Sequence, residues 1–173
     1  MGKHSQVSDQ GGLVRFVGQG SYAVDAKGRV SIPADFRAVI SQHYGTEELW
    51  ITTYKWVDEN RNVRVPLLQA YPRAEWEHTL ESLAERSAYD PRLNNFRRHF
   101  VAGATQCFPD KQGRVALTPE QRRHANLERD VMFLGTGLRY FEIWDLATWE
   151  KVRTEEEDEA YAGIGDVLKE HGL

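Results

Sequence analysis

The sequence lacks most of the features that mark secreted, membrane-spanning or metal-binding proteins. Its single cysteine, Cys107, cannot form an internal disulfide, and its place in an expected strand favours a buried thiol. No apolar run approaches the ~20 residues of a membrane span, and no segment resembles a signal peptide. The six histidines show no metal-ligand spacing and no cysteine pair accompanies them, so we expect no metal site. These absences favour a cytoplasmic protein that does not contact a membrane.

The short motifs of nucleotide-binding and hydrolytic enzymes are missing as well. The sequence contains no Gly-x-x-x-x-Gly-Lys-Ser/Thr, no Gly-x-Gly-x-x-Gly and no Gly-x-Ser-x-Gly. Asp25 and Asp110 could in principle act as paired carboxylates, but no nucleophile accompanies them in the sequence. We therefore expect a protein that is not an enzyme and that needs neither a cofactor nor a small-molecule substrate.

What the sequence does contain is one pattern that occurs twice. Residues 25–33 read Asp-Ala-Lys-Gly-Arg-Val-Ser-Ile-Pro, and residues 110–118 read Asp-Lys-Gln-Gly-Arg-Val-Ala-Leu-Thr, at a constant offset of 85. A second repeat consists of aromatic pairs five residues apart, Tyr71 with Trp76 and Trp144 with Trp149. Two copies of a turn that carries lysine and arginine indicate two copies of one surface, as an extended, repetitive ligand would require.

Each copy predicts a turn followed by a short strand and then a helix. After the glycine, apolar residues alternate with polar ones, which is typical of a strand with one buried face. The glycine supplies the positive φ that such a turn tends to need, and the aspartate accepts hydrogen bonds from turn amides. We therefore assign the shaping of the two turns to four residues: Asp25, Gly28, Asp110 and Gly113.

The two copies differ in how their helices begin. In the first copy, Pro33 ends the strand and opens a helix that carries Phe36 and Ile40 on one face. In the second copy, residues 118–121 read Thr-Pro-Glu-Gln, which predicts an N-cap, a proline at the first helical position and a capping box. The second helix therefore has the better start signal.

The pattern over residues 25–37 is Asp-x-x-Gly-Arg-hydrophobic-x-hydrophobic-Pro-x-x-hydrophobic-Arg, which resembles the DNA-binding signature of AbrB-type proteins. Two copies at this distance, closed by Tyr71-Pro72 and by residues 142–145, resemble the MraZ family of bacterial transcriptional regulators. The match covers most of the chain, from about residue 16 to about residue 152.

The resemblance implies a β-rich α+β fold of two tandem SpoVT-AbrB-like modules, each a swapped-hairpin or β-barrel element with short helices, related by a pseudo-twofold axis. It also implies a ring-shaped homo-oligomer that binds double-stranded DNA at direct repeats upstream of its own gene. Such a regulator would be nucleoid-associated and would mostly repress the division and cell-wall operon. The expected divisions are a disordered or expression-derived arm (1–14), a first module (15–88), an inter-module helix (89–102), a second module (103–153) and an acidic tail (154–173).

Carried over by position, the resemblance implies that residues 25–29 and 110–114 contact DNA. Arginine can read guanine through two hydrogen bonds, whereas lysine serves more as a point charge for phosphate. The expected DNA-binding residues are Lys27, Arg29, Lys111 and Arg114, with Arg15, Arg37 and Arg122 as further candidates for phosphate contact.

The charge distribution bears on this expectation. The formal net charge is −4, but seven acidic residues and one lysine fall within residues 154–173, which leaves +2 for residues 1–153. A charge of +2 is small for a nucleic-acid-binding protein, so one subunit is expected to bind weakly. An oligomer that presents many turns at once would recover affinity through effective concentration.

Alternatives remain open for individual residues and for the whole chain. Arg29 could simply pair with Asp25 across the turn as a surface salt bridge, and Arg37 and Arg122 could hold an aspartate of the turn. The five tryptophans favour core or interface packing over base stacking. The chain as a whole could instead be an oligomeric protein-interaction scaffold or antitoxin-like adaptor whose acidic tail binds a basic partner.

Overall fold

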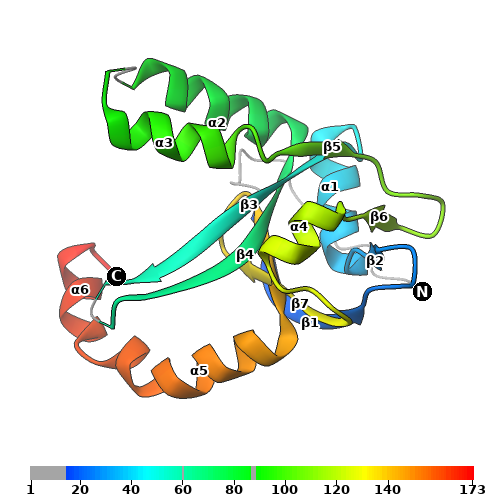
Figure 1. The fold of residues 1–173 in the computed structure, drawn as a ribbon. Helices are drawn as coiled ribbons and strands as arrows, with labels where there is room; N and C mark the ends of the chain where they lie inside the picture. The colour runs from blue at the N-terminus through cyan, green and yellow to red at the C-terminus, as the bar shows by residue number, and fades with distance from the viewer. Residues whose placement is uncertain (1–14, 60, 87–88) are drawn as a thin grey trace, which may run out of the picture.

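The computed structural model describes residues 15–59, 61–86 and 89–173 (Figure 1). The arm expected at residues 1–14 lies outside these residues. The elements follow the chain as β1 (Val17–Ala23), β2 (Arg29–Ser31), α1 (Ala34–Tyr44), β3 (Leu49–Asp58), β4 (Val63–Pro72), α2 (Arg73–Glu85), α3 (Pro91–Phe100), β5 (Thr105–Cys107), β6 (Arg114–Ala116), α4 (Pro119–His124), β7 (Asp130–Thr136), β8 (Phe141–Asp145), α5 (Leu146–Tyr161) and α6 (Ile164–Glu170). This arrangement confirms the predicted β-rich α+β fold. The described strands form an open six-stranded sheet and a two-stranded ribbon, with no closed barrel among them.

The order of strands in the large sheet is symmetric about its middle. From one edge to the other it runs β1-β7-β8-β4-β3-β5. By the sequence repeat, β1 corresponds to β5, β7 to β3 and β8 to β4, so a pseudo-twofold axis passes between β8 and β4. The first strand of each half pairs with the hairpin of the other half: β1 pairs with β7, and β5 with β3. The swapped arrangement therefore exists within a single chain.

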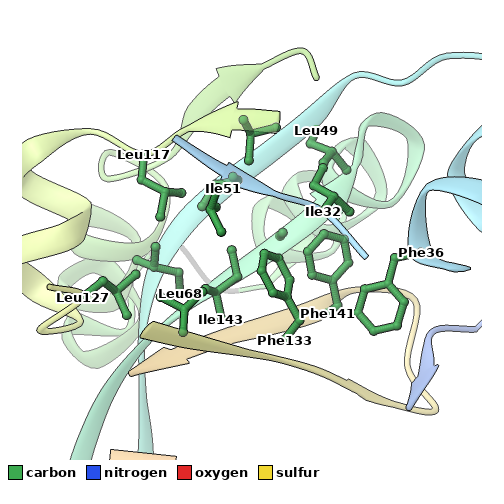
Figure 2. Packing of buried hydrophobic residues seen from close by; sticks show 14 of the residues in the cluster. Ile32, Phe36, Leu49, Ile51, Leu68, Leu117, Leu127, Phe133, Phe141 and Ile143 are labelled. Carbon is green, nitrogen blue, oxygen red and sulfur yellow. The ribbon is translucent and has the colours of Figure 1, made fainter. Parts of the chain in front are cut away.

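The ribbon of β2 and β6 lies on the same pseudo-twofold. Its register places Val30 opposite Val115, and both side chains are buried in the core beneath the ribbon. Below them, the large sheet and α1 supply aromatic rings (Figure 2). The ring of Phe36 lies 5.1 Å from that of Phe141 and 5.4 Å from that of Phe16, measured between centroids. One hydrophobic core therefore supports both turns.

The single cysteine lies at the edge of this core. Cys107 is half-buried on β5 and packs against the cluster. Burial raises the pKa of its thiol to about 12, so the thiol stays protonated near neutral pH. The sequence favours a buried thiol, and the structure places this thiol partly buried against the core.

The repeated aromatic pairs pack in the same way in both halves. Tyr71 and Trp76 have ring centroids 5.5 Å apart at 58°, and Trp144 and Trp149 have centroids 5.4 Å apart at 63°. Trp76 and Trp144 are each only 2% exposed. Trp50 stacks on Trp76 at 5.7 Å. These rings stabilise the helices that follow each hairpin, as the sequence predicts.

The hairpin of β3 and β4 is the longest feature of the sheet. The two strands pair from Leu49 with Pro72 to Asp58 with Val63, well beyond the neighbouring strands. β5 pairs with β3 only as far as Ile51. The hairpin therefore projects from the sheet toward α5 and α6, at the opposite end of the molecule from β2 and β6 (Figure 1).

An arginine at the hairpin tip fixes the acidic helix. Arg61 pairs with Glu159 at 2.9 Å and with Glu156 at 3.6 Å, and it donates a hydrogen bond of 2.9 Å to the carbonyl oxygen of Glu155. Residues 154–173, the expected acidic tail, are largely helical and form the end of α5 and α6. None of the helices in the described part of the chain is long and apolar enough to cross a membrane.

Candidate nucleic-acid interface

The first turn is closed by its aspartate. The carboxylate oxygen Oδ1 of Asp25 accepts hydrogen bonds from the backbone amides of Lys27 and Arg29, both at 2.9 Å. The amide of Gly28 donates to the carbonyl oxygen of Asp25 at 2.9 Å, and the amide of Asp25 donates to that of Arg29 at 2.8 Å. One aspartate thus satisfies the amides of a turn whose glycine has φ of 76°.

The second turn repeats these contacts, and the corresponding distances differ by at most 0.1 Å. Asp110 Oδ1 accepts from the amides of Gln112 at 2.9 Å and Arg114 at 3.0 Å. The backbone bonds that close the turn are both 2.8 Å long, and Gly113 has φ of 73°. Two sequences that differ at both tip positions therefore give one backbone shape.

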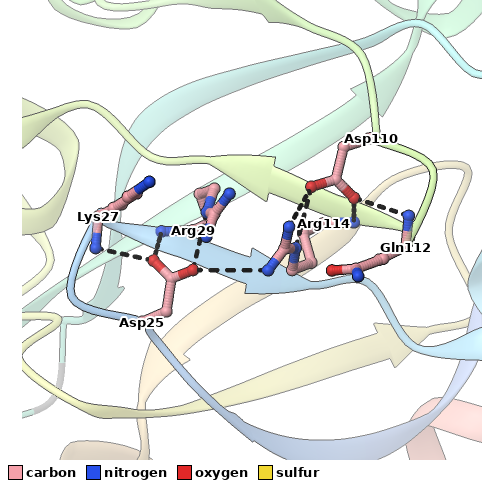
Figure 3. A network of polar contacts seen from close by, with 6 residues as sticks. All are labelled: Asp25, Lys27, Arg29, Asp110, Gln112 and Arg114. Atoms are coloured by element: carbon pink, nitrogen blue, oxygen red, sulfur yellow. Dashed lines mark hydrogen bonds and ion pairs between the residues drawn. The ribbon is translucent and has the colours of Figure 1, made fainter.

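Each turn arginine forms an ion pair with the aspartate of its own turn (Figure 3). Arg29 Nε lies 2.7 Å from Asp25 Oδ2, and Arg114 binds Asp110 Oδ2 through Nε and Nη2, both at 2.9 Å. Arg114 Nη1 also lies 3.9 Å from Asp25 Oδ2, which links the two turns. The structure thus contains the salt bridge between Arg29 and Asp25 that the sequence left open as an alternative.

The surroundings of both carboxylates favour their charged form. The backbone amide of Arg29, and then its side chain, hold the pKa of Asp25 below its usual range. The backbone amide of Arg114, followed by its guanidinium, lowers the pKa of Asp110 to about 2. Both aspartates are therefore ionised at neutral pH and keep their arginines oriented.

The ribbon places both arginines on one face. Arg29 lies opposite Ala116, and Arg114 lies opposite Ser31, while the valines between them point into the core. Because side chains alternate along a strand, Arg29 and Arg114 share the outer face. Each turn is also bound to the other copy: Ile32 N donates to Gly113 O at 3.0 Å, and Leu117 N donates to Gly28 O at 2.9 Å.

The arginines of the following helices cross over to the opposite turn. Arg37 of α1 packs on Gly113, where an added Cβ would lie 2.6 Å from its guanidinium. Arg122 of α4 packs on Gly28, where an added Cβ would meet its guanidinium at 3.0 to 3.2 Å. The Nε atoms of both arginines are buried and, among the described residues, have no hydrogen-bond partner. Each of these arginines thus supports the backbone of the other copy's turn.

The remaining predicted residues lie at exposed positions. Lys27 and Lys111 are both exposed at the turn tips, but they are not equivalent in the repeat. Position 27 corresponds to Gln112, which is also exposed and which the sequence interpretation overlooked. The offset of 85 would have identified it. Arg15 donates a hydrogen bond of 2.6 Å from Nη1 to the carbonyl oxygen of Gly137.

Taken together, the two turns and their supporting helices gather six basic side chains around two carboxylates: Lys27, Arg29, Arg37, Lys111, Arg114 and Arg122 around Asp25 and Asp110. Such a surface can bind an extended anion through several weak contacts. Within residues 15–59, 61–86 and 89–173, no group of three His, Cys, Asp or Glu side chains could hold a metal ion.

Comparison with known proteins identifies the family. A family model described as "MraZ protein, putative antitoxin-like" matches residues 100–162. The transcriptional regulator MraZ of Syntrophobacter fumaroxidans is 39% identical over 135 residues, which cover 78% of this chain and 82% of that protein. The chain belongs to the MraZ family.

Other MraZ proteins match over still longer stretches. The transcriptional regulator MraZ of Geobacter metallireducens is 36% identical over 151 residues, covering 87% of this chain and 94% of that protein. That of Lachnoclostridium phytofermentans is 33% identical over 161 residues, covering 91% and 98%. These matches confirm the MraZ resemblance inferred from the two turn motifs.

Proposed function

We propose that this member of the MraZ family is a sequence-specific DNA-binding transcriptional regulator. It would repress the division and cell-wall operon by binding direct repeats upstream of its own gene. Its place of action would be the cytoplasm, in association with the nucleoid. The relatives named transcriptional regulators support the general function, and the turn geometry supports the assignment of the contact surface.

The observation that carries this proposal is the pairing of the two turns across the ribbon. Arg29 and Arg114 share one face, and the second lies within 3.9 Å of the first turn's aspartate. One chain therefore offers two copies of one contact, and both belong to one paired ribbon above a shared core. Two linked contacts bind a repeated ligand more strongly than either would alone.

The ion pairs are compatible with reading bases. An arginine has five N–H donors in a fixed fork. Arg29 pairs with its aspartate through Nε, and Arg114 pairs through Nε and Nη2, so each keeps further N–H donors for a ligand. In this proposal, Asp25 and Asp110 orient Arg29 and Arg114 before DNA arrives, which lowers the entropy lost on binding. The guanidinium ends would then contact guanine in the major groove or the phosphates that border it.

The other basic residues would contribute to affinity more than to specificity. Lys27 and Lys111 at the tips would neutralise phosphates. Arg37 and Arg122 would hold the turns and offer their terminal nitrogens to phosphate, and Arg15 would add a peripheral contact. Repression would follow from occlusion of the promoter by adjacent turns of a ring-shaped homo-oligomer, without chemistry.

The test is fluorescence anisotropy of the purified protein on labelled DNA from upstream of its own gene, compared with scrambled DNA. The salt concentration is varied from about 50 to 200 mM, over which a phosphate-binding protein loses affinity steeply. We expect Arg29→Ala/Arg114→Ala to lose selective binding by more than tenfold. The control is Arg86→Ala/Arg153→Ala, which removes the same charge from two exposed positions, one directly after α2 and one on α5.

Circular dichroism of each variant establishes that the fold is retained. If both DNAs bind equally and feebly, and the turn variant behaves like the control, the DNA-binding proposal is wrong. In that case a protein-interaction scaffold is the better description, and deletion of residues 154–173 should abolish its partner binding.

A further inference from the structure

A groove beside the outer edge of β3 has no role in the proposed DNA contact. It has a volume of about 740 Å³, and its walls come from α3, from the β3–β4 hairpin and from α4. The pairing of β5 with β3 ends at Ile51, so among the described strands none covers this edge of β3 further along. The volume falls within the range of about 300–1,000 Å³ that is typical of sites for small molecules.

One wall of the groove presents an aromatic ring. Phe96 of α3 lines the groove, is 36% exposed and stacks on Phe100, with ring centroids 4.8 Å apart and an interplanar angle of 18°. Phe100 is buried and in turn contacts the rings of Tyr54, Tyr71 and Trp76. The ring of Phe96 is therefore held in place while part of it stays exposed, which suits stacking with a flat apolar group.

Positive charge gathers along the same groove. Val57 pairs with Arg64 across the hairpin, and Lys55 lies two residues before Val57, so these side chains share one face. Arg98 of α3 also lines the groove, and Glu120 contributes the one carboxylate of its lining. Within the described ranges, none of the three cations forms an ion pair. Three unpaired cations beside one carboxylate favour an anionic ligand.

The third wall of the groove is α4, which connects it to the first turn. Glu120 and His124 are four residues apart, so they share one side of the helix, and both line the groove. Nε2 of His124 donates a hydrogen bond of 2.9 Å to the carbonyl oxygen of Tyr54. Arg122, halfway between them in sequence, lies on the other side of the helix and packs on Gly28. This short helix therefore lies between the groove and the ribbon that carries the turns (Figure 1).

The equivalent helix of the first half is packed differently. Val39 of α1 corresponds to His124 at the offset of 85, and it packs against the hydrophobic core. The second half thus has a polar residue facing a groove where the first half has an apolar contact. The repeat alone therefore does not account for the groove.

We propose that this groove is an effector site, which binds a small organic anion with a flat apolar ring system. The ring system would stack on Phe96, and Lys55, Arg64 and Arg98 would neutralise the anionic group. A ligand that contacts α4 together with α3 and β3 would hold α4 in the position from which Arg122 supports the first turn. Ligand binding should therefore strengthen DNA binding, and DNA should strengthen ligand binding by the same factor. This link rests on the proposed DNA-binding function, whereas the ligand site itself does not.

The site is tested by fluorescence titration without DNA. The probe is anilinonaphthalene sulfonate, an aromatic anion whose emission rises in an apolar site, and phenylnaphthylamine is the neutral probe with the same ring system but no sulfonate. We expect the wild type to bind the sulfonate more tightly than the neutral probe. Phe96→Ala, and separately Arg64→Ala/Arg98→Ala, should weaken binding of the sulfonate by about tenfold or more.

Two matched controls lie outside the groove. Phe108→Ala removes an aromatic ring that is 61% exposed, and Arg86→Ala/Arg153→Ala removes the same charge as the double groove variant. Both should bind the sulfonate as the wild type does, and circular dichroism establishes that each variant is folded. The site is ruled out if the neutral probe binds as tightly as the sulfonate, or if the groove variants bind the sulfonate like their controls.

The link to the turn is tested by adding anilinonaphthalene sulfonate to the anisotropy titration on upstream DNA. We expect the affinity of the wild type for DNA to rise by about fivefold or more. Phe96→Ala should bind DNA as the wild type does without the probe and should not respond to it. A wild-type affinity that stays constant or falls on addition of the probe overturns the link through α4. Groove-dependent probe binding by a protein that does not bind upstream DNA would uphold the site and contradict the DNA-binding proposal.

Discussion

The two halves of the chain use different side chains to anchor the helix behind each turn. In the first half, α1 follows Pro33 without a side-chain cap, and its position is fixed by Phe36, which is 3% exposed. In the second half, the residue at the same place in the repeat is Gln121, which is 1% exposed and completes a capping box with Thr118. Its Nε2 also donates to the carbonyl oxygen of Ile51 at 2.8 Å.

This difference shows which features the two turns share and which features differ between them. In both copies the aspartate accepts the same two backbone hydrogen bonds and pairs with the arginine of its own turn. The helix behind each turn, in contrast, is anchored by an aromatic ring in one copy and by hydrogen bonds in the other. The shape of the turn is therefore the shared element. If the turns are the contact surface, changes to the anchors should alter stability before they alter recognition.

The largest effect is expected from the two anchors. Phe36→Ala removes a ring packed against two others and should cost about 3–5 kcal/mol of unfolding free energy. Gln121→Ala leaves buried polar groups without partners and should cost about 1–3 kcal/mol. Urea denaturation at a fixed protein concentration measures both, with Gln42→Ala on the exposed side of α1 as control. Equal costs would show that the two anchors are energetically equivalent and would remove the contrast.

The turn glycines should rank next. Gly113→Ala and Gly28→Ala both place a side chain at positive φ, which costs about 1–2 kcal/mol. Gly113→Ala should cost more, because its Cβ would lie 2.6 Å from Arg37, compared with 3.0 Å from Arg122 for Gly28→Ala. The same denaturation assay applies.

Two controls isolate the steric part of this prediction. Gly45→Ala has a positive φ but no heavy atom within 4 Å of the new Cβ, so it reports the backbone cost alone. Gly113→Ala should lose more unfolding free energy than Gly45→Ala does. Adding Arg37→Ala to Gly113→Ala should restore this additional loss. If the excess persists in the double variant, Arg37 does not press on this turn.

A smaller effect concerns acid stability. The folded-state pKa of Asp110 is about 2, below the value near 4 of an unfolded chain, so its contribution is complete above about pH 4 and is lost as the pH falls through about 2. Stability should therefore fall less steeply with decreasing pH in Asp110→Asn than in the wild type over this range. Tryptophan fluorescence follows the unfolding. Asp166→Asn on α6 controls for the loss of one carboxylate. If stability falls as steeply in Asp110→Asn as in the wild type, groups other than Asp110 cause the acid sensitivity.

The smallest effect should come from the tip residues. Gln112→Lys gives the second turn the lysine of the first, and one more phosphate contact should steepen the dependence of log K on log salt by about 0.9. Lys27→Gln should reduce that slope by a similar amount, with less than a tenfold change in affinity. Lys169→Gln on α6 serves as control. Slopes that do not respond to either change would exclude the tips from the contact.

Local features of this fold were predictable from the sequence, and the reason is physical. The alternation around Val30 and Val115 gave the short strands, and residues 118–121 gave the capping box that the structure contains. Phe36 and Ile40 form the buried face of α1 as the helical spacing predicts. Each of these signals depends on residues within one or two turns of one another.

Long-range pairings could not be predicted in this way. That β1 pairs with β7, and β5 with β3, depends on segments far apart in the chain that share no local pattern. The contact of Arg37 with Gly113 crosses the pseudo-twofold axis, so a search near either residue gives no sign of it. The repeat indicates symmetry, but it does not say which half supplies each contact.

The central claim, that the paired turns face DNA, is tested most directly by cross-linking from equivalent positions. Ala26 and Lys111 occupy the same place in the two copies and are both exposed. Ala26→Cys and Lys111→Cys, each in a Cys107→Ser background and labelled with a photoactivatable group, should both cross-link to labelled operator DNA. Glu157→Cys on α5 should not. If position 157 reacts as well as the turns, or neither turn reacts while DNA is bound, the turns are not the contact surface.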